Sequence, residues 1–338
     1  MAAKRGPLTY AQAGVDIRRG DRVVEHLKKT APGIGGFSGL FPFPHRGWRS
    51  PILVGSTDGV GTKLLVADAV GRHDTVGIDC VAMVVNDIVV CGAQPLFFLD
   101  YIGIGRLKLG QAKQILAGVA AGCEQADCAL LGGETAEMPG LYPQGLYDLV
   151  GFSVGVVEKT KILRPQSVRP GDRLIGIASS GLHSNGFSLA RKIVFERAGL
   201  KVHDRVRELG ATVGRALLTP TRIYARPVLS LLRRHEIRSM AHITGGGIPN
   251  RVNRALSPGC DAVVDTSRWP RPAIFDWLAE LGPVREEEMF RTFNMGLGMI
   301  LVVPPRSAPG VLRALRRMGE KAYEVGQARK GTGAVHLE

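Results

Sequence analysis

The run TVGIDCVAMVVNDIVVC, residues 75–91, decides the architecture of this 338-residue chain. It is too long for an ordinary strand and almost wholly apolar, so it predicts a helix that is buried on nearly all sides. Short apolar runs at residues 52–56 and 96–104 flank it and predict strands. Strands that alternate with helices are typical of a layered α/β fold.

The alternation continues to the end of the chain, and it falls into two sets. The segment PQSVRPGD, residues 165–172, has two prolines and turn-forming residues, which predicts a domain boundary. We therefore expect an N-terminal arm over 1–50, an α/β domain over 51–166 and a second α/β domain over 167–338. Further strands are predicted at 128–131, 149–157, 173–178, 239–243, 262–264, 297–303 and 322–327, and further helices at 109–125, 187–198, 221–235, 248–256, 272–281 and 308–318.

The arm combines a short helical pattern with a glycine-rich stretch. Residues 21–30 have the apolar spacing of a helix. They are followed by PGIGGFSG, residues 32–39, which holds too much glycine for regular structure. This stretch is either a mobile lid or a turn that lies against a ligand.

Composition narrows the classes of function. The chain has 44 Lys+Arg against 30 Asp+Glu, a formal net charge of +14, which favours anionic ligands. Aromatic residues are only 6%, so stacking platforms for single-stranded nucleic acid are not indicated, and we interpret the charge mainly as a solvated surface. No apolar run approaches the ~18 residues of a membrane span, and no signal peptide is visible. Five cysteines without a CxxC pair indicate a reduced, cytoplasmic protein without a zinc site.

The loop STDGVGTK, residues 56–63, follows a predicted strand. Its order differs from a Walker P-loop, yet its glycines allow backbone amides to approach an anion. Lys63 adds a positive charge, and Asp58 could hold Mg²⁺ between phosphates. The alternative is a glycine turn with a solvated Asp and Lys.

Three strongly polar groups interrupt the apolar helix, namely Asp79, Asn86 and Asp87. A buried carboxylate is costly unless it is paired, hydrogen-bonded or bound to metal. Asp58 and Asp87 together would make an oxygen-rich Mg²⁺ site that also uses substrate phosphates. The alternative is a capping and ion-pairing role at the end of the helix.

Three more glycine-containing loops follow predicted strands, where open α/β sheets place ligands. They are GGETAE at 132–137, SSGLHSNG at 179–186 and TGGG at 244–247. The second loop offers hydroxyls and His183, a possible general acid or base. Each loop is equally well explained as a surface turn or a flexible joint, so no single one decides the function.

Taken together, these segments resemble one family. They are VGSTDGVGTKL (54–64), GIDCVAMVVNDIVVCGAQPLFFLDY (77–101), LGGETAEMPG (131–140), GFSVGVVEK (151–159), SSGLHSNGFSL (179–189), TPTRIY (219–224), HITGGG (242–247) and RTFNMGLGM (291–299). The chain resembles phosphoribosylformylglycinamidine cyclo-ligases, also called aminoimidazole ribonucleotide synthetases, from residue 10 almost to its end. The resemblance implies two α/β domains per chain and a homodimer whose N-terminal domains close a central β-barrel, with the second domain flanking it.

The resemblance also implies roles for individual positions. Those implied to bind ATP and its phosphates are Gly59, Gly61, Thr62, Lys63, Gly132, Gly133, Glu134, Gly245, Gly246 and Gly247. Those implied to face the substrate are Ser179, Ser180, His183, Ser184 and Asn185. Those implied to be catalytic are Lys63, Asp87, His183 and Asn185. Those implied to hold Mg²⁺ are Asp58, Asp87 and Glu134, and GIGGFSGLF (33–41) matches a glycine-rich lid.

The implied reaction converts ATP and formylglycinamidine ribonucleotide into aminoimidazole ribonucleotide, ADP and phosphate. Phosphorylation turns the amide oxygen into a leaving group, and a nitrogen of the same substrate then closes the five-membered ring. The enzyme mainly folds the substrate and neutralises phosphoryl charge. We expect His183 to assist proton transfer during ring closure.

The alternatives fall into three classes. One is another ATP-dependent phosphotransferase of the same superfamily, although the cysteines of the selenophosphate synthetase and hydrogenase-maturation types are absent from the corresponding places. Another is a nucleic-acid-binding module that uses the positive charge, and the third is a non-catalytic scaffold. We expect a small ribonucleotide substrate and neither nucleic acid nor membrane as a partner.

Overall fold

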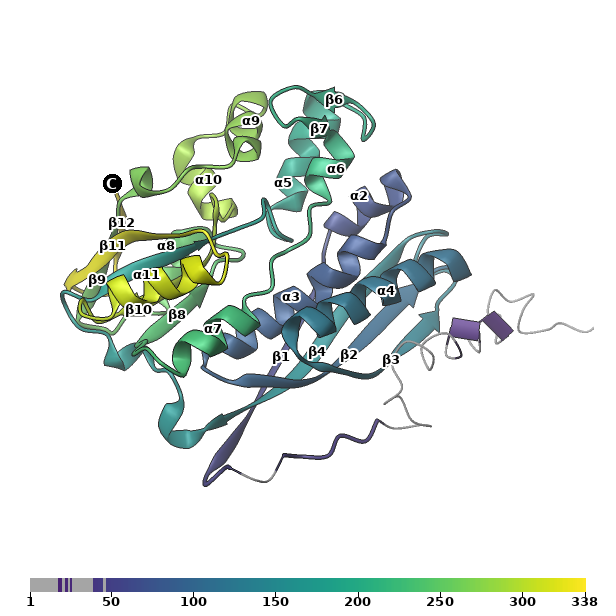
Figure 1. Ribbon diagram of the computed structural model, residues 1–338. Helices are drawn as coiled ribbons and strands as arrows, with labels where there is room; N and C mark the ends of the chain where they lie inside the picture. Colours follow the sequence, from purple (N-terminus) through teal and green to yellow (C-terminus); the bar gives the residue numbers. More distant parts are fainter. Residues whose placement is uncertain (1–17, 20–21, 24, 26–38, 45–46) are drawn as a thin grey trace, which may run out of the picture.

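The computed structural model describes residues 18–19, 22–23, 25, 39–44 and 47–338 (Figure 1). The helix predicted over 21–30 and most of the glycine-rich stretch lie outside the described residues. No helix in the described part combines the length and apolarity that a membrane span needs.

A four-stranded sheet forms the first layer of the molecule. Its order is β1 (Pro51–Gly59), β4 (Tyr147–Glu158), β2 (Gln94–Ile104) and β3 (Ala129–Glu137). Only the pair of β2 and β3 is parallel. Helices α3 (Asp74–Val90) and α4 (Leu109–Ala126) lie side by side across one face, as Figure 1 shows. The predicted α/β fold is confirmed.

Helix α3 is buried on nearly all sides, as its sequence predicts, because it packs on the sheet, on α4 and on the second set of elements. Its contact with α4 is a backbone contact. A Cβ atom on Gly77 would overlap the carbonyl oxygen of Ile115, and one on Gly118 would overlap the carbonyl oxygen of Asp74. Glycine at these two positions therefore sets the distance between the two helices.

The second sheet has six strands in the order β12-β9-β11-β5-β10-β8. Strand β10 (Leu297–Val303), which lies between β5 and β8, is buried at every position, which explains its uninterrupted apolar sequence. The other strands are β5 (Arg173–Ala178), β8 (Ser239–His242), β9 (Cys260–Val264), β11 (Ala322–Lys330) and β12 (Val335–Leu337). The helices in this part of the chain are α5 (Phe187–Arg191), α6 (Val213–Leu217), α7 (Ala225–Leu232), α8 (Gly247–Asn253), α9 (Ala273–Leu281), α10 (Glu286–Thr292) and α11 (Ala308–Arg317).

The structure differs from the predicted elements at a few places. The helix predicted over 221–235 is shorter, because residues 219–224 run extended along α3 and give their backbone groups to its polar side chains. The helix predicted over 187–198 continues beyond α5 as a π-helical turn, Lys192–Arg197. The sequence patterns did not predict α2 (Lys63–Val70), α6, α10, β12 or the short pair β6 (Arg205–Val206) and β7 (Ala211–Thr212).

The face of the first sheet opposite α3 and α4 carries exposed apolar side chains. Leu53, Tyr101 and Phe152 alternate with residues that point toward α3, and they are 61%, 36% and 41% exposed. On the inner face of β1, Ser56 and Asp58 share the side of the strand that faces α3. The strand therefore brings Asp58 to the seam where the two sheets' elements meet.

Candidate active site

Four charged or titratable side chains from both halves of the chain meet at this seam. Asp87 comes from the last turn of α3, Asp58 from the end of β1, His242 from the end of β8 and Arg251 from α8. His242 Nδ1 lies 2.8 Å from Asp87 Oδ1. The charges of the other three side chains all act on the pKa of Asp58, so the four side chains form one electrostatic cluster.

The hydrogen bonds around His242 fix its tautomer. Asn86 Nδ2 donates to the Arg222 carbonyl and lies 3.4 Å from His242 Nε2, while Asn86 Oδ1 accepts from the Tyr224 amide. Nε2 must therefore accept, and the neutral ring carries its proton on Nδ1, which donates to Asp87. The His242 side chain is almost fully buried, whereas that of Asp87 is 44% exposed. His242 thus orients a carboxylate that remains open to the site.

Asp58 and Asp87 have the chemistry of a magnesium site. Burial raises the pKa of Asp58, and the charge of Asp87 adds to this effect, while a hydrogen bond from the Gly59 amide opposes it. A bound cation would relieve this repulsion. Mg²⁺ is commonly held by one or two carboxylates together with substrate phosphates, so the pair fits this ion.

Glu134, the third predicted metal ligand, is not part of this cluster. It lies on β3, at the opposite edge of the sheet from β1, which is three strand spacings or about 14 Å away. The described residues hold no group of three His, Cys, Asp or Glu side chains placed to bind one metal ion. The structure therefore places Glu134, with Gly132 and Gly133 on the same strand, apart from Asp58 and Asp87, and its role as a metal ligand stays a prediction.

Lys63 does not occupy the predicted phosphate-contacting place. Its ammonium group is fully buried and donates to Asp79 Oδ1 at 2.9 Å, to the His183 carbonyl at 2.9 Å and to the Thr219 carbonyl at 2.8 Å. Burial lowers the pKa of Lys63, and Asp79 opposes that shift. Since all three protons are used inside the protein, Lys63 joins the two halves of the chain in this structure, and its phosphate-binding role stays a prediction.

Asp79 completes this internal network. Its Oδ1 also accepts hydrogen bonds from the amide of Thr221 at 2.7 Å and from the Thr221 hydroxyl at 2.6 Å. The extended residues 219–224 are thereby fastened to α3 at Asp79 and, two turns later, at Asn86. Two of the three polar groups in the apolar helix are thus explained by this attachment.

His183 is also enclosed. It is 1% exposed, adopts φ +62°, and its Nε2 accepts from the Ser180 amide at 3.2 Å. Burial, with the nearby charges of His242 and Lys63, holds the pKa of His183 well below its usual value. This neutral, buried ring packs inside the loop of residues 179–186, and its expected role toward the substrate stays a prediction.

Two predicted loops do come together. Asn185 Oδ1 accepts from the Gly245 amide at 3.0 Å, which joins the loop of residues 179–186 to that of 244–247. Gly247 is required by packing, because a Cβ there would overlap the Phe290 carbonyl. Gly246 has φ +96°, a conformation that favours glycine.

The predicted serine and threonine side chains in these loops and in the turn before α2 already form hydrogen bonds within the protein. Ser179 donates to Asn294 and Gly181, and Ser180 donates to the Pro220 carbonyl. Further hydroxyl pairs join Ser184 to Thr221 and Thr62 to Ser188. Gly59 and Gly61 flank the turn between β1 and α2.

A cavity of about 360 Å³ opens beside the charged cluster. Its walls come from β1, the end of α3, β8 and α8. Its polar lining residues are Ser56, Asp87, Ser239, His242, Arg251 and Arg254. The sequence patterns did not single out His242 or the two arginines, and the only available signal was that His242 lies two residues before the TGGG turn of residues 244–247.

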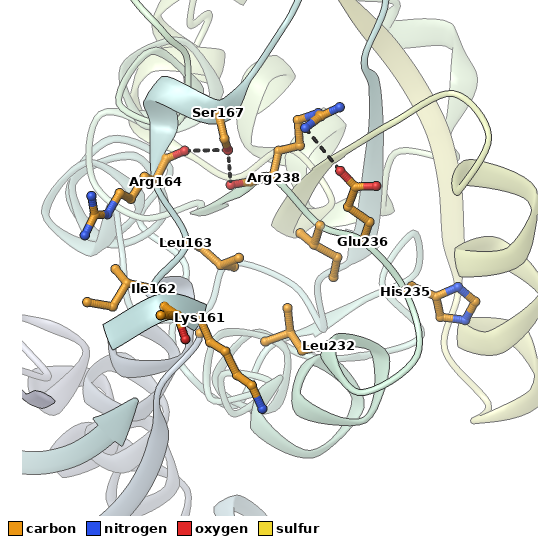
Figure 2. Close-up of a pocket in the computed structure, with 12 residues that line it drawn as sticks. Lys161, Ile162, Leu163, Arg164, Ser167, Leu232, His235, Glu236 and Arg238 are labelled. Atoms are coloured by element: carbon orange, nitrogen blue, oxygen red, sulfur yellow. Dashed lines mark hydrogen bonds and ion pairs between the residues drawn. The ribbon is translucent and has the colours of Figure 1, made fainter. Parts of the chain in front are cut away.

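A second cavity, of about 450 Å³, lies along residues 160–167 and the segment before β8 (Figure 2). Its polar groups satisfy one another: Ser167 donates to the Arg164 and Arg238 carbonyls, and Arg238 pairs with Glu236. In Figure 2 the charged end of Lys161 and the ring of His235 point away from the centre. This cavity brings no reactive groups together.

Comparison with known proteins identifies the family. The family model for the N-terminal domain of AIR synthase related proteins matches residues 49–157 of this chain, and the model for their C-terminal domain matches residues 169–337. The chain is 53% identical to the phosphoribosylformylglycinamidine cyclo-ligase of Myxococcus xanthus over 334 residues, which cover 96% of this chain and 97% of that protein. This chain belongs to the phosphoribosylformylglycinamidine cyclo-ligase family. The enzyme of that name from Anaeromyxobacter sp. is also 53% identical, with 98% of each chain covered.

Solved structures share the fold of this cyclo-ligase family member at low sequence identity. Thiamine-monophosphate kinase from Stenotrophomonas maltophilia superposes with a TM-score of 0.68 at 16% identity, covering 94% of this chain and 95% of that one. Hydrogenase maturation protein HypE in complex with ATP gives 0.67 at 18% identity, covering 94% and 91%. These similarities show a common two-sheet architecture and nothing about the substrate.

Proposed function

We propose that the chain catalyses the ATP-dependent cyclisation of formylglycinamidine ribonucleotide to aminoimidazole ribonucleotide, with release of ADP and phosphate, in purine biosynthesis. The observation that carries this proposal is identity above 50% over nearly the whole length to enzymes of that name. The cluster of Asp58, Asp87 and His242 supports it, because Asp87 and His242 line a cavity between the two sheets and Asp58 lies close enough to act on both through its charge.

The chemistry asks the protein to position the substrate and to neutralise charge. Transfer of the γ-phosphoryl group to the amide oxygen gives an iminophosphate, and attack by the substrate's own nitrogen closes the ring and expels phosphate. Asp58 and Asp87 would hold Mg²⁺, which neutralises phosphoryl charge when it is bound. His242 keeps the Asp87 carboxylate in one orientation through the 2.8 Å hydrogen bond.

The assembly we propose is a homodimer in the cytoplasm, with units over residues 51–166 and 167–338. The exposed Leu53, Tyr101 and Phe152 side chains lie on one face of the first sheet. A contiguous apolar surface of this kind is typical of a protein contact. A second copy that covers it would close the sheet into a barrel.

A coupled assay tests the function. Full-length protein is incubated with ATP, Mg²⁺ and formylglycinamidine ribonucleotide, and aminoimidazole ribonucleotide and ADP are measured together. We expect one ADP for each ring closed. ATP hydrolysis without ring closure, or phosphorylation of a different acceptor, would instead indicate another phosphotransferase of the superfamily.

A further inference from the structure

We propose that Arg251 and Arg254 form the binding site for the 5′-phosphate of the substrate ribonucleotide, beside the carboxylates that would hold Mg²⁺ with the ATP phosphates. This inference rests on the proposed function and deepens it. Both arginines belong to or directly follow α8, and both line the cavity of about 360 Å³ beside Asp87.

The first step of the argument is the position of the two guanidinium groups. They are three residues apart, so they lie on the same side of the helix, where like charges repel. Arg254 lowers the pKa of Arg251, after the larger effect of burial. Two cations at this spacing beside one cavity cost stability unless an anion lies between them.

The second step is the lack of a direct ion pair. Asp87 and Asp58 act on Arg251 through their charge, but neither forms an ion pair with it in the described part of the chain. Arg251 Nε donates to the Gly245 carbonyl at 2.8 Å, which fixes the side chain. Across the described ranges, neither arginine has a carboxylate within ion-pairing distance. Other arginines do, for example Arg222 with Glu320 at 2.7 Å and Arg238 with Asp172 at 2.9 Å. The closest carboxylate in the cavity, Asp87, is bound to His242.

The third step is the match between charge and ligand. Two guanidinium groups carry a charge of about +2, which balances the charge of about −2 on a phosphate monoester near neutral pH, and guanidinium groups can bind phosphate oxygens in bidentate geometry. Ser56 and Ser239 line the same cavity and can add hydroxyl donors. Its apolar walls, Val54, Val90 and Met240, suit a sugar better than a triphosphate, which carries more charge than this site balances.

The test separates the two nucleotides. In the coupled assay, Arg254→Gln should raise KM for the ribonucleotide by about 10- to 100-fold, the value of one charged hydrogen-bonded contact, and leave KM for ATP within about twofold. Arg316→Gln, an exposed arginine on α11, is the matched control and should change neither. A rise in KM for ATP with unchanged KM for the ribonucleotide would assign the pair to ATP and overturn the proposal.

A binding measurement decides the question even without turnover. Calorimetric titration of the ribonucleotide and of its dephosphorylated nucleoside into wild-type protein should show a preference of at least about 10-fold for the phosphorylated form. Arg254→Gln should reduce this preference, with an unchanged circular dichroism spectrum. Equal binding of the two ligands by the wild type would refute the phosphate site, whereas a lack of ring closure alone would refute only the proposed function.

Discussion

Two charged clusters lie at the same seam, and they differ in how completely they are satisfied. In the first, Lys63 and Asp79 are fully buried and bound to each other and to residues 219–221. In the second, Asp58, Asp87 and Arg251 are partly exposed and line or adjoin a cavity. The difference shows that a lysine or aspartate beside a glycine-rich turn can serve folding or ligand binding. The number of internal partners distinguishes the two roles.

The largest expected effect comes from breaking the closed cluster. Lys63→Met leaves the Asp79 carboxylate buried without its cation, which should lower the free energy of unfolding by about 3–5 kcal/mol. Urea denaturation of the full-length protein measures this loss. Lys113→Met, an exposed lysine on α4, is the matched control and should leave the midpoint unchanged. Unchanged stability with a raised KM for ATP would show that Lys63 binds phosphate after all.

The open cluster should respond in the opposite way. Asp87→Asn removes a negative charge from the proposed magnesium site, so kcat should fall by about 100-fold or more, while the unfolding midpoint stays close to wild type because the side chain is 44% exposed. Steady-state kinetics and urea denaturation are measured on the same preparation. Asp276→Asn, a surface aspartate on α9, serves as the control. A loss of stability as large as that of Lys63→Met would erase the distinction between the clusters.

A smaller effect concerns a buried carboxyl group outside both clusters. Burial raises the pKa of Asp100 to about 7, and its Oδ1 has no partner within the described residues. The folded state therefore binds an extra proton between the unfolded pKa of ~3.9 and about 7. In this window the stability should fall as pH rises, by at most about 1.4 kcal/mol per pH unit, and it should level off above pH 7.

The measurement for Asp100 is a series of urea denaturation curves from pH 5 to 8. Asp100→Asn removes the titrating group and should flatten the dependence. Asp68→Asn, on the exposed side of α2, should keep the wild-type slope. If wild type and Asp100→Asn show the same slope, Asp100 is ionised in the folded protein.

Much of the fold was predictable because burial follows apolar periodicity. The buried helix of residues 75–91 and the buried strand of residues 297–303 were predicted within one residue of their ends. The extended segment of residues 219–224 could not be predicted, because it depends on hydrogen bonds to Asp79 and Asn86, far away in the sequence. Local propensity contains no information about such partners.

The site was predicted in part, and for a related reason. Spacing along the helix identified Asp87, and the glycine turn identified Asp58, and the structure brings these two together. The sequence could not distinguish Lys63, which is buried in an internal network, from a lysine that binds phosphate, because both kinds of lysine follow a glycine turn. Arg251 and Arg254 could be recognised as site residues only from the structure, because their place in the cavity depends on the packing of α8 beside β1 and α3.

The backbone contact between Gly77 and Gly118 has a consequence for how this enzyme can evolve. Helix α3 carries Asp79, Asn86 and Asp87, so its distance from α4 sets the position of both charged clusters. A methyl group on Gly118, in a helix with no proposed catalytic residue, would push α3 and displace the carboxylate at the other end of it. Selection for ring closure therefore also acts on Gly77 and Gly118, where any side chain would change the distance between the two helices.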